Sequence, residues 1–275
     1  MKVALYAFPQ NGRANHIADA MQIGLTVHGI RAPILRRWTG DVVADVVIAY
    51  GWNHEAVFTA YRRAGGHFAY FDMGYFNRKP VGDKGGAREG HHRLSVDGWD
   101  TADTMARGMP ADRWDDLGIE VAPNRTGEQP GAVLVAGMSG KAAGTHGFKP
   151  LEWELRTVAQ IKKEFPTVEV IYRPKPASLD AIEPIADVLK RVGMIVTHHS
   201  NVAVDGLVAA VPSWAAKGVG KMVSVPSMLD AVAQRAPVLS LDERRALLAD
   251  VAYAQWAPSE MRSGAAWEHI RRIIE

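Results

Sequence analysis

The stretch PNRTGEQPGAVLVAGMSGK, residues 123–141, decides the fold, because it separates two regions that share one alternation of strands and helices. It begins with prolines, glycines and polar residues, which are typical of a linker. It continues with the apolar run Ala132–Ala136, which predicts a buried strand, and ends in a glycine-rich turn. We therefore expect a first lobe at 1–126 and a second lobe at 127–257.

The region before this linker alternates apolar strand patterns with amphipathic helix patterns. Strands are predicted at 2–8, 42–49 and 67–71, and helices at 14–27 and 55–63. Strands that alternate with helices predict a parallel sheet covered by helices.

The region after the linker repeats the pattern. It predicts helices at 152–165, 178–191 and 203–209, with strands at 168–172 and 194–197 between them. The tail, 258–275, reads as a closing helix that packs back on the first lobe. The fold class expected is α/β, with two Rossmann-like, doubly wound lobes facing a central cleft, where open α/β sheets bind ligands.

Composition excludes several classes of chemistry. The 275 residues include no cysteine, which excludes disulfides, thiolate metal sites and cysteine nucleophiles. The net charge of +2 is below that of many dedicated nucleic-acid binders. No run approaches the roughly 18 apolar residues of a membrane helix, and the N-terminus reads as a first strand rather than a targeting signal. We expect no membrane partner and a cytoplasmic location.

Two cations follow the predicted strand 168–172. Arg173 and Lys175 alternate with prolines, which restrict the backbone at the strand end. A guanidinium and an ammonium in this position are suited to a phosphate ligand.

The next strand leads into THHSN, residues 197–201, and then into a helix. Small polar residues at such a turn, here His199, Ser200 and Asn201, present backbone N–H groups to a pyrophosphate. Asp205, one turn further on, is placed to accept hydrogen bonds from ribose hydroxyls. We expect no metal here, because neighbouring residues on a strand point to opposite faces.

The turn GMSGK, residues 137–141, invites comparison with a phosphate-binding P-loop. It has too few residues before the Gly-Lys pair and does not match that motif. Ser139, Gly140 and Lys141 remain candidates for contacts with a diphosphate.

Two residues of the first lobe are candidate catalytic bases. Asp72 follows the predicted strand 67–71, where a carboxylate can remove a proton from an attacking hydroxyl. His16, near the start of the first helix, is the alternative. The polar, glycine-rich segment 77–90 is longer than most connections and predicts a binding loop.

The segment THHSNVAVDGLVAAVPSWA, after YRPKP, resembles the signature of nucleotide-sugar glycosyltransferases of the GT-B fold. The resemblance implies a nucleotide-sugar donor, such as UDP-glucose or another UDP-sugar. We expect no tightly bound cofactor, and nothing in the sequence requires a divalent metal. It differs from the family pattern at Asp205, where glutamate is usual, and at Ala210, where glycine is usual.

A second resemblance covers residues 49–99. YGWNHEAVFTAYRRAGGHFAYFDMGYFNRKP and GHHRLSVDGW resemble small tailed-phage glycosyltransferases of DNA hypermodification systems. This implies that the acceptor is a 5-hydroxymethylpyrimidine in duplex DNA, a substrate that requires phosphate contacts. A phage-encoded chain would have the host cytoplasm as its expected location. The expected DNA-contacting residues are Arg13, Arg78, Lys79, Lys84 and Arg88.

Other functions stay open at this point. The acceptor can instead be a cell-envelope polysaccharide, or the two lobes can form a sugar-nucleotide epimerase or hydrolase. A non-catalytic module that binds a nucleotide or DNA is a further alternative. A dehydrogenase is disfavoured, because PQNGRANH after the first strand lacks the G-x-G-x-x-G spacing.

Overall fold

The computed structural model describes residues 1–51, 54–78, 89–125, 131–175, 183–234 and 239–275. The chain forms two compact units. Unit 1 consists of residues 1–106 and 252–275, and unit 2 consists of residues 107–251. The division therefore lies earlier in the chain than the predicted boundary between residues 126 and 127.

Contacts at both ends of the segment 107–125 explain this earlier boundary. The buried carboxylate of Asp250 pairs with Arg107 Nε at 3.0 Å and accepts a hydrogen bond from the Met109 amide at 2.8 Å. Further along, the Ala122 amide donates to the Val208 carbonyl at 2.8 Å. These contacts join residues that are far apart in the sequence, so local patterns near residue 126 could not predict them.

Unit 1 contains a six-stranded sheet in the order β10-β5-β4-β3-β1-β2. The strands are β1 (Val3–Tyr6), β2 (Ile34–Leu35), β3 (Val46–Tyr50), β4 (His67–Met73), β5 (His92–Val96) and β10 (Gln255–Trp256). The first four are parallel, whereas β5 is antiparallel to β4 and β10 is antiparallel to β5. The expectation of a wholly parallel sheet is therefore corrected at this edge, where the chain returns from unit 2 to add β10.

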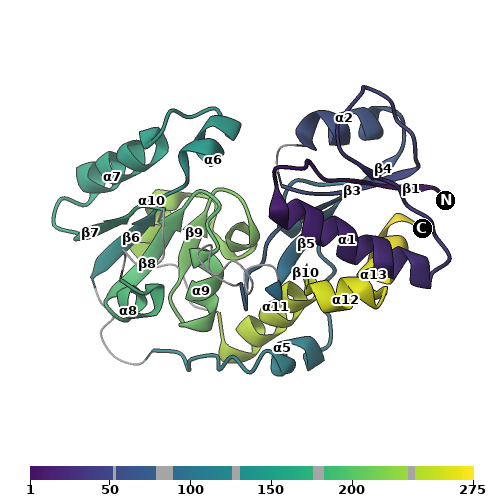
Figure 1. Ribbon diagram of the computed structural model, residues 1–275. Helices are drawn as coiled ribbons and strands as arrows, with labels where there is room; N and C mark the ends of the chain where they lie inside the picture. The colour runs from purple at the N-terminus through teal and green to yellow at the C-terminus, as the bar shows by residue number, and fades with distance from the viewer. Residues whose placement is uncertain (52–53, 79–88, 126–130, 176–182, 235–238) are drawn as a thin grey trace. The chain divides into compact units, whose positions relative to one another are not determined.

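Helices cover both faces of this sheet (Figure 1). One face packs on α1 (Gly12–Val27), α12 (Pro258–Arg262) and α13 (Ala265–Ile274), and the other packs on α2 (Glu55–Arg63). The predicted single tail helix is thus two helices, because Gly264 adopts φ +89° between them. Gly24 allows α12 to approach α1, since a Cβ there would lie 1.9 Å from the Met261 carbonyl oxygen.

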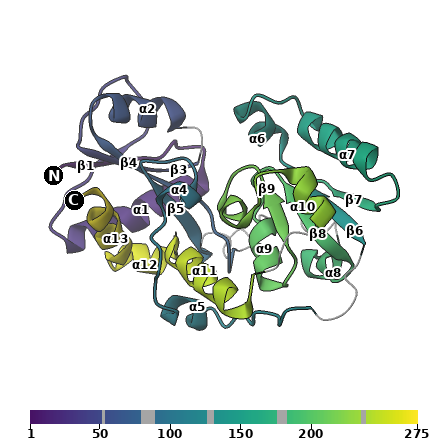
Figure 2. The same ribbon diagram turned by 180° about the vertical axis from the view of Figure 1, so that it is seen from behind.

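Unit 2 contains a four-stranded parallel sheet in the order β7-β6-β8-β9. The strands are β6 (Ala132–Ala136), β7 (Val170–Arg173), β8 (Val192–Thr197) and β9 (Ser213–Ala215). One face packs on α7 (Glu152–Glu164) and α10 (Met228–Gln234), and the other on α8 (Ile185–Lys190) and α9 (Val202–Val208), as Figures 1 and 2 show. Helices on both faces make this unit doubly wound, as predicted.

The remaining elements of the described chain are four short helices and one longer helix. The short ones are α4 (Thr101–Thr104), α5 (Asp112–Asp116), α6 (Gly140–Thr145) and the 3-10 helix η3 (Val219–Val223), and the longer one is α11 (Leu241–Tyr253). The first part of the helix predicted at 178–191 lies outside the described residues. No described helix is long and apolar enough to span a membrane.

Candidate functional site

The strand order of unit 2 marks a position for ligand binding. The chain passes from β6 to β7 on one side and then to β8 on the other side of β6. In open α/β sheets, ligands bind at the carboxyl ends of the strands where the order reverses. In unit 2 this point lies between the turns that follow β6 and β8.

The turn after β6 is held by a carboxylate that the sequence analysis missed. Glu154 is 1% exposed, and its Oε1 accepts a hydrogen bond from the Met138 amide at 2.8 Å. Its Oε2 has no hydrogen-bond partner in the described part of the chain. The sequence contained a signal for the burial of Glu154, because it shares a helical spacing with Thr157 and Ile161, the other buried residues of α7.

The predicted donor-binding residues of this turn lie at the start of α6. Ser139 caps the helix, and its Oγ accepts a hydrogen bond from the Ala142 amide at 3.2 Å. Gly140 begins the helix, and Lys141 is exposed beside it. Ser139 therefore has a structural role, and its predicted contact with a diphosphate stays a prediction.

The two cations after β7 are held differently. Arg173 is half-buried and donates from Nη1 to the Glu183 carbonyl at 2.7 Å. Lys175 is exposed. Since β7 is adjacent to β6, Arg173 lies next to the glycine-rich turn, where the Gly137 amide donates to the Arg173 carbonyl at 2.9 Å.

The histidines after β8 differ from the sequence expectation. His198 and His199 lie beyond the last strand residue, Thr197, so the alternation of strand side chains does not apply to them. Their Nδ1 atoms are 2.9 Å apart, and the ring of His146 lies 4.5 Å and 4.8 Å from their ring centroids. Burial, with contributions from His146 and Lys217, lowers the pKa of His198 to about 4.

The start of α9 is less open to an anion than we expected. The helix has seven residues, and the Ser200 amide donates to Thr197 Oγ1 at 3.2 Å. The Val202 amide donates to Ser200 Oγ at 3.3 Å. Asn201 and Asp205 are half-buried at and within this helix. Their predicted contacts with pyrophosphate and ribose stay predictions.

In unit 1, Asp72 lies within β4 rather than after it. Its carboxylate accepts hydrogen bonds from Tyr70 Oη at 2.8 Å, the Met73 amide at 2.8 Å and Arg93 Nη2 at 2.9 Å. Burial raises the pKa of this carboxyl, but the Arg93 charge and the donated hydrogen bonds outweigh it, so the pKa of Asp72 is lowered. A carboxylate stabilised in this way is a weak base.

The second predicted base, His16, is next to a carboxylate. Its Nε2 lies 3.0 Å from Glu89 Oε1, and the side chain of His16 is 20% exposed. Arg262 Nη2 lies 3.3 Å from both atoms. A carboxylate beside a histidine orients the ring and selects its tautomer.

Arg13 and Arg78 are the described members of the predicted DNA-binding set. Arg13 is part-buried, donating to Tyr50 Oη at 3.2 Å and contacting the Met73 sulfur. Arg78 lines an open hollow of about 460 Å³ with Asn77, Glu89 and His91. The remaining residues, Lys79, Lys84 and Arg88, lie outside the described part of the chain.

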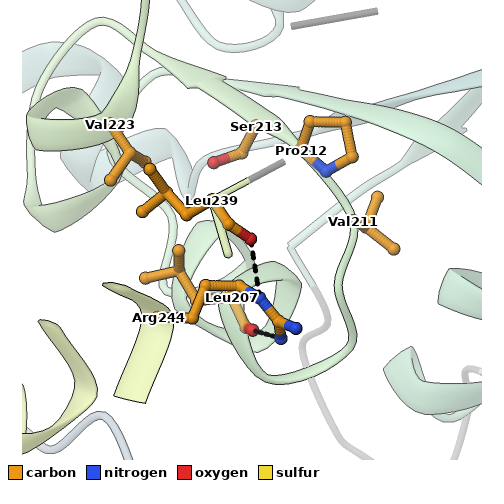
Figure 3. Close-up of a pocket in the computed structure, with 7 residues that line it drawn as sticks. All are labelled: Leu207, Val211, Pro212, Ser213, Val223, Leu239 and Arg244. Carbon is orange, nitrogen blue, oxygen red and sulfur yellow. Dashed lines mark hydrogen bonds between the residues drawn. The ribbon is translucent and has the colours of Figure 1, made fainter. Parts of the chain in front are cut away.

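A second cavity, near α9 and α11, is structural. It measures about 20 Å³, room for a single water molecule, and Figure 3 shows Arg244 beside it. Arg244 is 1% exposed and donates to the carbonyls of Leu207, Leu239 and Ala122. This side chain joins three segments of unit 2 and is no candidate for substrate binding.

Comparisons with known proteins give the fold. No model of a known protein family matches the chain, and no curated protein matches it. The chain is similar to a solved structure of Thermosulfurimonas dismutans KpsC, β-Kdo 2,4-transferase, with a TM-score of 0.54 and 13% identity over 100% of this chain and 98% of that one. It is also similar to the β-Kdo 2,7-transferase of the same protein, with a TM-score of 0.50 and 11% identity over 99% of both chains.

These similarities show that the chain has the α/β fold of GT-B glycosyltransferases, as the resemblance in the sequence implied. At sequence identities of 11% and 13%, the similarity shows a shared fold and no shared activity or substrate. They give no support to the expected resemblance to phage DNA-modification proteins.

Proposed function

We propose that this chain is a glycosyltransferase that moves a sugar from a nucleotide-activated donor to a hydroxyl group of a cell-envelope saccharide. The observation that carries the proposal is the agreement of fold with two Kdo transferases over nearly the whole length of each chain. The basic residues at the strand ends of unit 2 support it independently, because an activated sugar carries phosphate.

Unit 2 is the proposed donor-binding unit. Arg173, Lys175 and Lys141 supply positive charge near the point where the strand order reverses. Gly137 lets Tyr172 and Glu154 pack closely against this turn, since a Cβ there would lie 3.1 Å from Tyr172 Oη and 3.3 Å from Glu154 Oε1. The side chains of Ser200, Asn201 and Asp205 offer polar contacts to the nucleotide.

Unit 1 is the proposed source of the catalytic base. When His16 donates its Nε2 proton to Glu89, its Nδ1 carries the lone pair that accepts a proton. Asp72 is the weaker candidate, because three donors already bind its carboxylate. Its contacts with Arg93 and Tyr70 suit a residue that holds the end of β4 in place.

In the proposed reaction, the acceptor hydroxyl oxygen bonds to the anomeric carbon of the sugar. The bond from that carbon to the phosphate oxygen breaks, and the nucleotide leaves with the electron pair. His16 Nδ1 takes the hydroxyl proton. The charges of Arg173 and Lys175 stabilise the negative charge that develops on the leaving phosphate.

A saccharide acceptor is favoured over DNA. The two proteins of similar fold are named as Kdo transferases, which supports sugar chemistry on a saccharide and not on DNA for this chain. Of the five residues expected to bind DNA, Arg13 is held by Tyr50 and Met73, which leaves it poorly placed to reach a phosphate backbone.

The test is a donor and acceptor panel analysed by mass spectrometry. The purified chain is incubated with CMP-, UDP-, GDP- and ADP-activated sugars and with saccharide acceptors that include Kdo-terminated oligosaccharides. A parallel arm contains duplex DNA with 5-hydroxymethylpyrimidines. The proposal expects a sugar-sized mass gain on a saccharide, which is lost in His16→Gln.

Other results would reject parts of the proposal. A mass gain only on the DNA nucleosides would move the acceptor to DNA. Conversion of the donor to an isomer without transfer would indicate an epimerase. Binding of a nucleotide sugar without any turnover would leave a binding module, and the absence of both binding and turnover would reject the glycosyltransferase altogether.

A further inference from the structure

Unit 2 holds a group of three histidines that come from two separate segments. His146 follows α6 directly, and His198 and His199 form the turn after β8. The three rings are neighbours, with the His146 ring 4.5 Å from that of His198 and 4.8 Å from that of His199. In the part of the chain that the structure describes, they form a cluster of metal-ligating type.

We propose that His146, His198 and His199 bind one divalent transition-metal ion of the class that prefers imidazole ligands, with Zn²⁺ as the natural occupant. Neutral imidazole nitrogen is a preferred ligand of Zn²⁺, Ni²⁺ and Cu²⁺, whereas Mg²⁺ and Ca²⁺ prefer oxygen. Three histidines are a known ligand set for Zn²⁺ with an open fourth position.

The distances suit a shared ion. Zn–N bonds of about 2.0–2.1 Å place two nitrogens of a tetrahedral site about 3.3 Å apart. The Nδ1 atoms of His198 and His199 are 2.9 Å apart, and one ligand atom from each of the three histidines lies within 4.8 Å of the others. Shifts of about 1–1.5 Å, within the reach of side-chain rotation, therefore bring all three nitrogens to bonding distance.

The surroundings restrict the ring of His198. The rings of Phe148 and Trp153 each make a T-shaped contact with it, with ring centroids 5.7 Å from that of His198. The backbone carbonyl of His198 accepts a hydrogen bond from the Lys217 amide at 2.7 Å. A ligand ring that is packed and anchored in this way loses little entropy when it binds an ion.

The position of the cluster suggests what the ion would do. It lies at the turn after β8, beside the point where the strand order of unit 2 reverses. Three protein ligands leave at least one coordination position open, and a phosphate oxygen can occupy it. This last step rests on the proposed function, whereas binding of the ion does not.

Metal binding is tested on the full chain without any donor. The protein is stripped with a chelator, freed of any affinity tag that contains histidine, and titrated with Zn²⁺, Ni²⁺ and, as an oxygen-preferring control, Mg²⁺. Calorimetry is expected to give one site for Zn²⁺ and for Ni²⁺. Substitution with Co²⁺ adds a visible absorption band whose intensity reports tetrahedral coordination.

Single variants identify the ligands. His146→Ala and His199→Ala are each expected to weaken Zn²⁺ binding by at least about tenfold. His67→Ala is the matched control, because His67 is a half-exposed histidine of unit 1 paired with Asp97. Circular dichroism of each variant separates loss of ligands from loss of fold.

The outcomes are distinct from those of the transfer assay. Absence of a Zn²⁺ or Ni²⁺ site in the folded protein would overturn the metal proposal, as would equal affinity in wild type and in His146→Ala. Zn²⁺ binding that depends on the cluster would support it, even if no sugar transfer is found. Transfer activity that is indifferent to chelation would separate the ion from the reaction and limit it to a structural site.

Discussion

Both units carry charged side chains on or shortly after their strands, but these side chains differ in how exposed they are. In unit 1, Asp72 pairs with Arg93, and His16 pairs with Glu89. In unit 2, Lys141 and Lys175 are exposed beside a glycine-rich turn. The part-buried pairs of unit 1 position their members, whereas the exposed cations of unit 2 can be reached by an anionic ligand.

This difference is the basis of the different tasks that we propose for the two units. In unit 1 the paired groups are suited to orient a base, so substitutions there should change turnover more than donor affinity. In unit 2 the exposed cations are suited to bind phosphate, so substitutions there should change donor affinity more than turnover. The predictions below test this contrast.

The largest effect is expected at His16. His16→Gln should lower kcat by about 10²–10⁴-fold, the usual contribution of a general base, with donor affinity little changed. Asp72→Asn serves as the comparison and should lower kcat by less, because Asn keeps hydrogen-bonding atoms for Tyr70 and Arg93. Steady-state kinetics with the identified donor measure both, and a larger loss in Asp72→Asn would return the base to Asp72.

The next effect concerns the stability of unit 2. Arg244→Met should lower the free energy of unfolding by about 3 kcal/mol, because it leaves the carbonyls of Leu207, Leu239 and Ala122 without their donor. The neighbouring exposed Arg245 provides the control, and Arg245→Met should change stability by less than about 0.5 kcal/mol. Urea denaturation measures both, and equal losses would contradict a structural role specific to Arg244.

The free energy of unfolding is expected to change with pH by up to about 3 kcal/mol because of His92 in unit 1. Burial, aided by the charge of Arg13, lowers the pKa of His92 to about 4. Between pH 6.5 and about 4 the unfolded chain therefore binds a proton that the folded chain does not, so stability falls as the pH falls through this window. His92→Gln should flatten the stability profile there, and an unchanged profile would show that His92 is protonated in the folded protein.

The smallest effect concerns the cations of unit 2. Lys175→Ala should weaken binding of the nucleotide sugar by about 3- to 10-fold, with kcat changed less, since an exposed charge is screened by solvent. Lys190→Ala, on an exposed lysine of α8 that pairs with Asp187, is the control. Calorimetry at low and high salt measures both. Loss of affinity in the control alone would place the phosphate elsewhere.

Most of the secondary structure could be predicted from local patterns. The helix over Glu55–Arg63 and the strand over Ala132–Ala136 have the predicted bounds, because their apolar residues have one clear period. β5 was not predicted, since HRLSV is short and is defined by its pairing with β4. β10 has two residues and depends on a segment far away in the sequence.

The candidate site was predictable only in part. The sequence predicted which cations, glycines and small polar residues follow the strands of unit 2, because the strands themselves are apolar runs. The role of Glu154 was not predicted, because its partner, the Met138 amide, belongs to another segment. The convergence of His146 on His198 and His199 was equally hidden, since no local rule brings a residue after α6 against the turn after β8.

The sequence by itself determined the α/β class, the two-part organisation and the basic strand ends, because period, turn residues and charge are local properties. The tertiary structure decided where the chain divides, which carboxylate is paired and which histidines meet. Those features depend on contacts between segments far apart in the chain, such as Arg107 with Asp250 and His16 with Glu89. Their energies depend on burial and partner geometry, which exist only after the chain has folded.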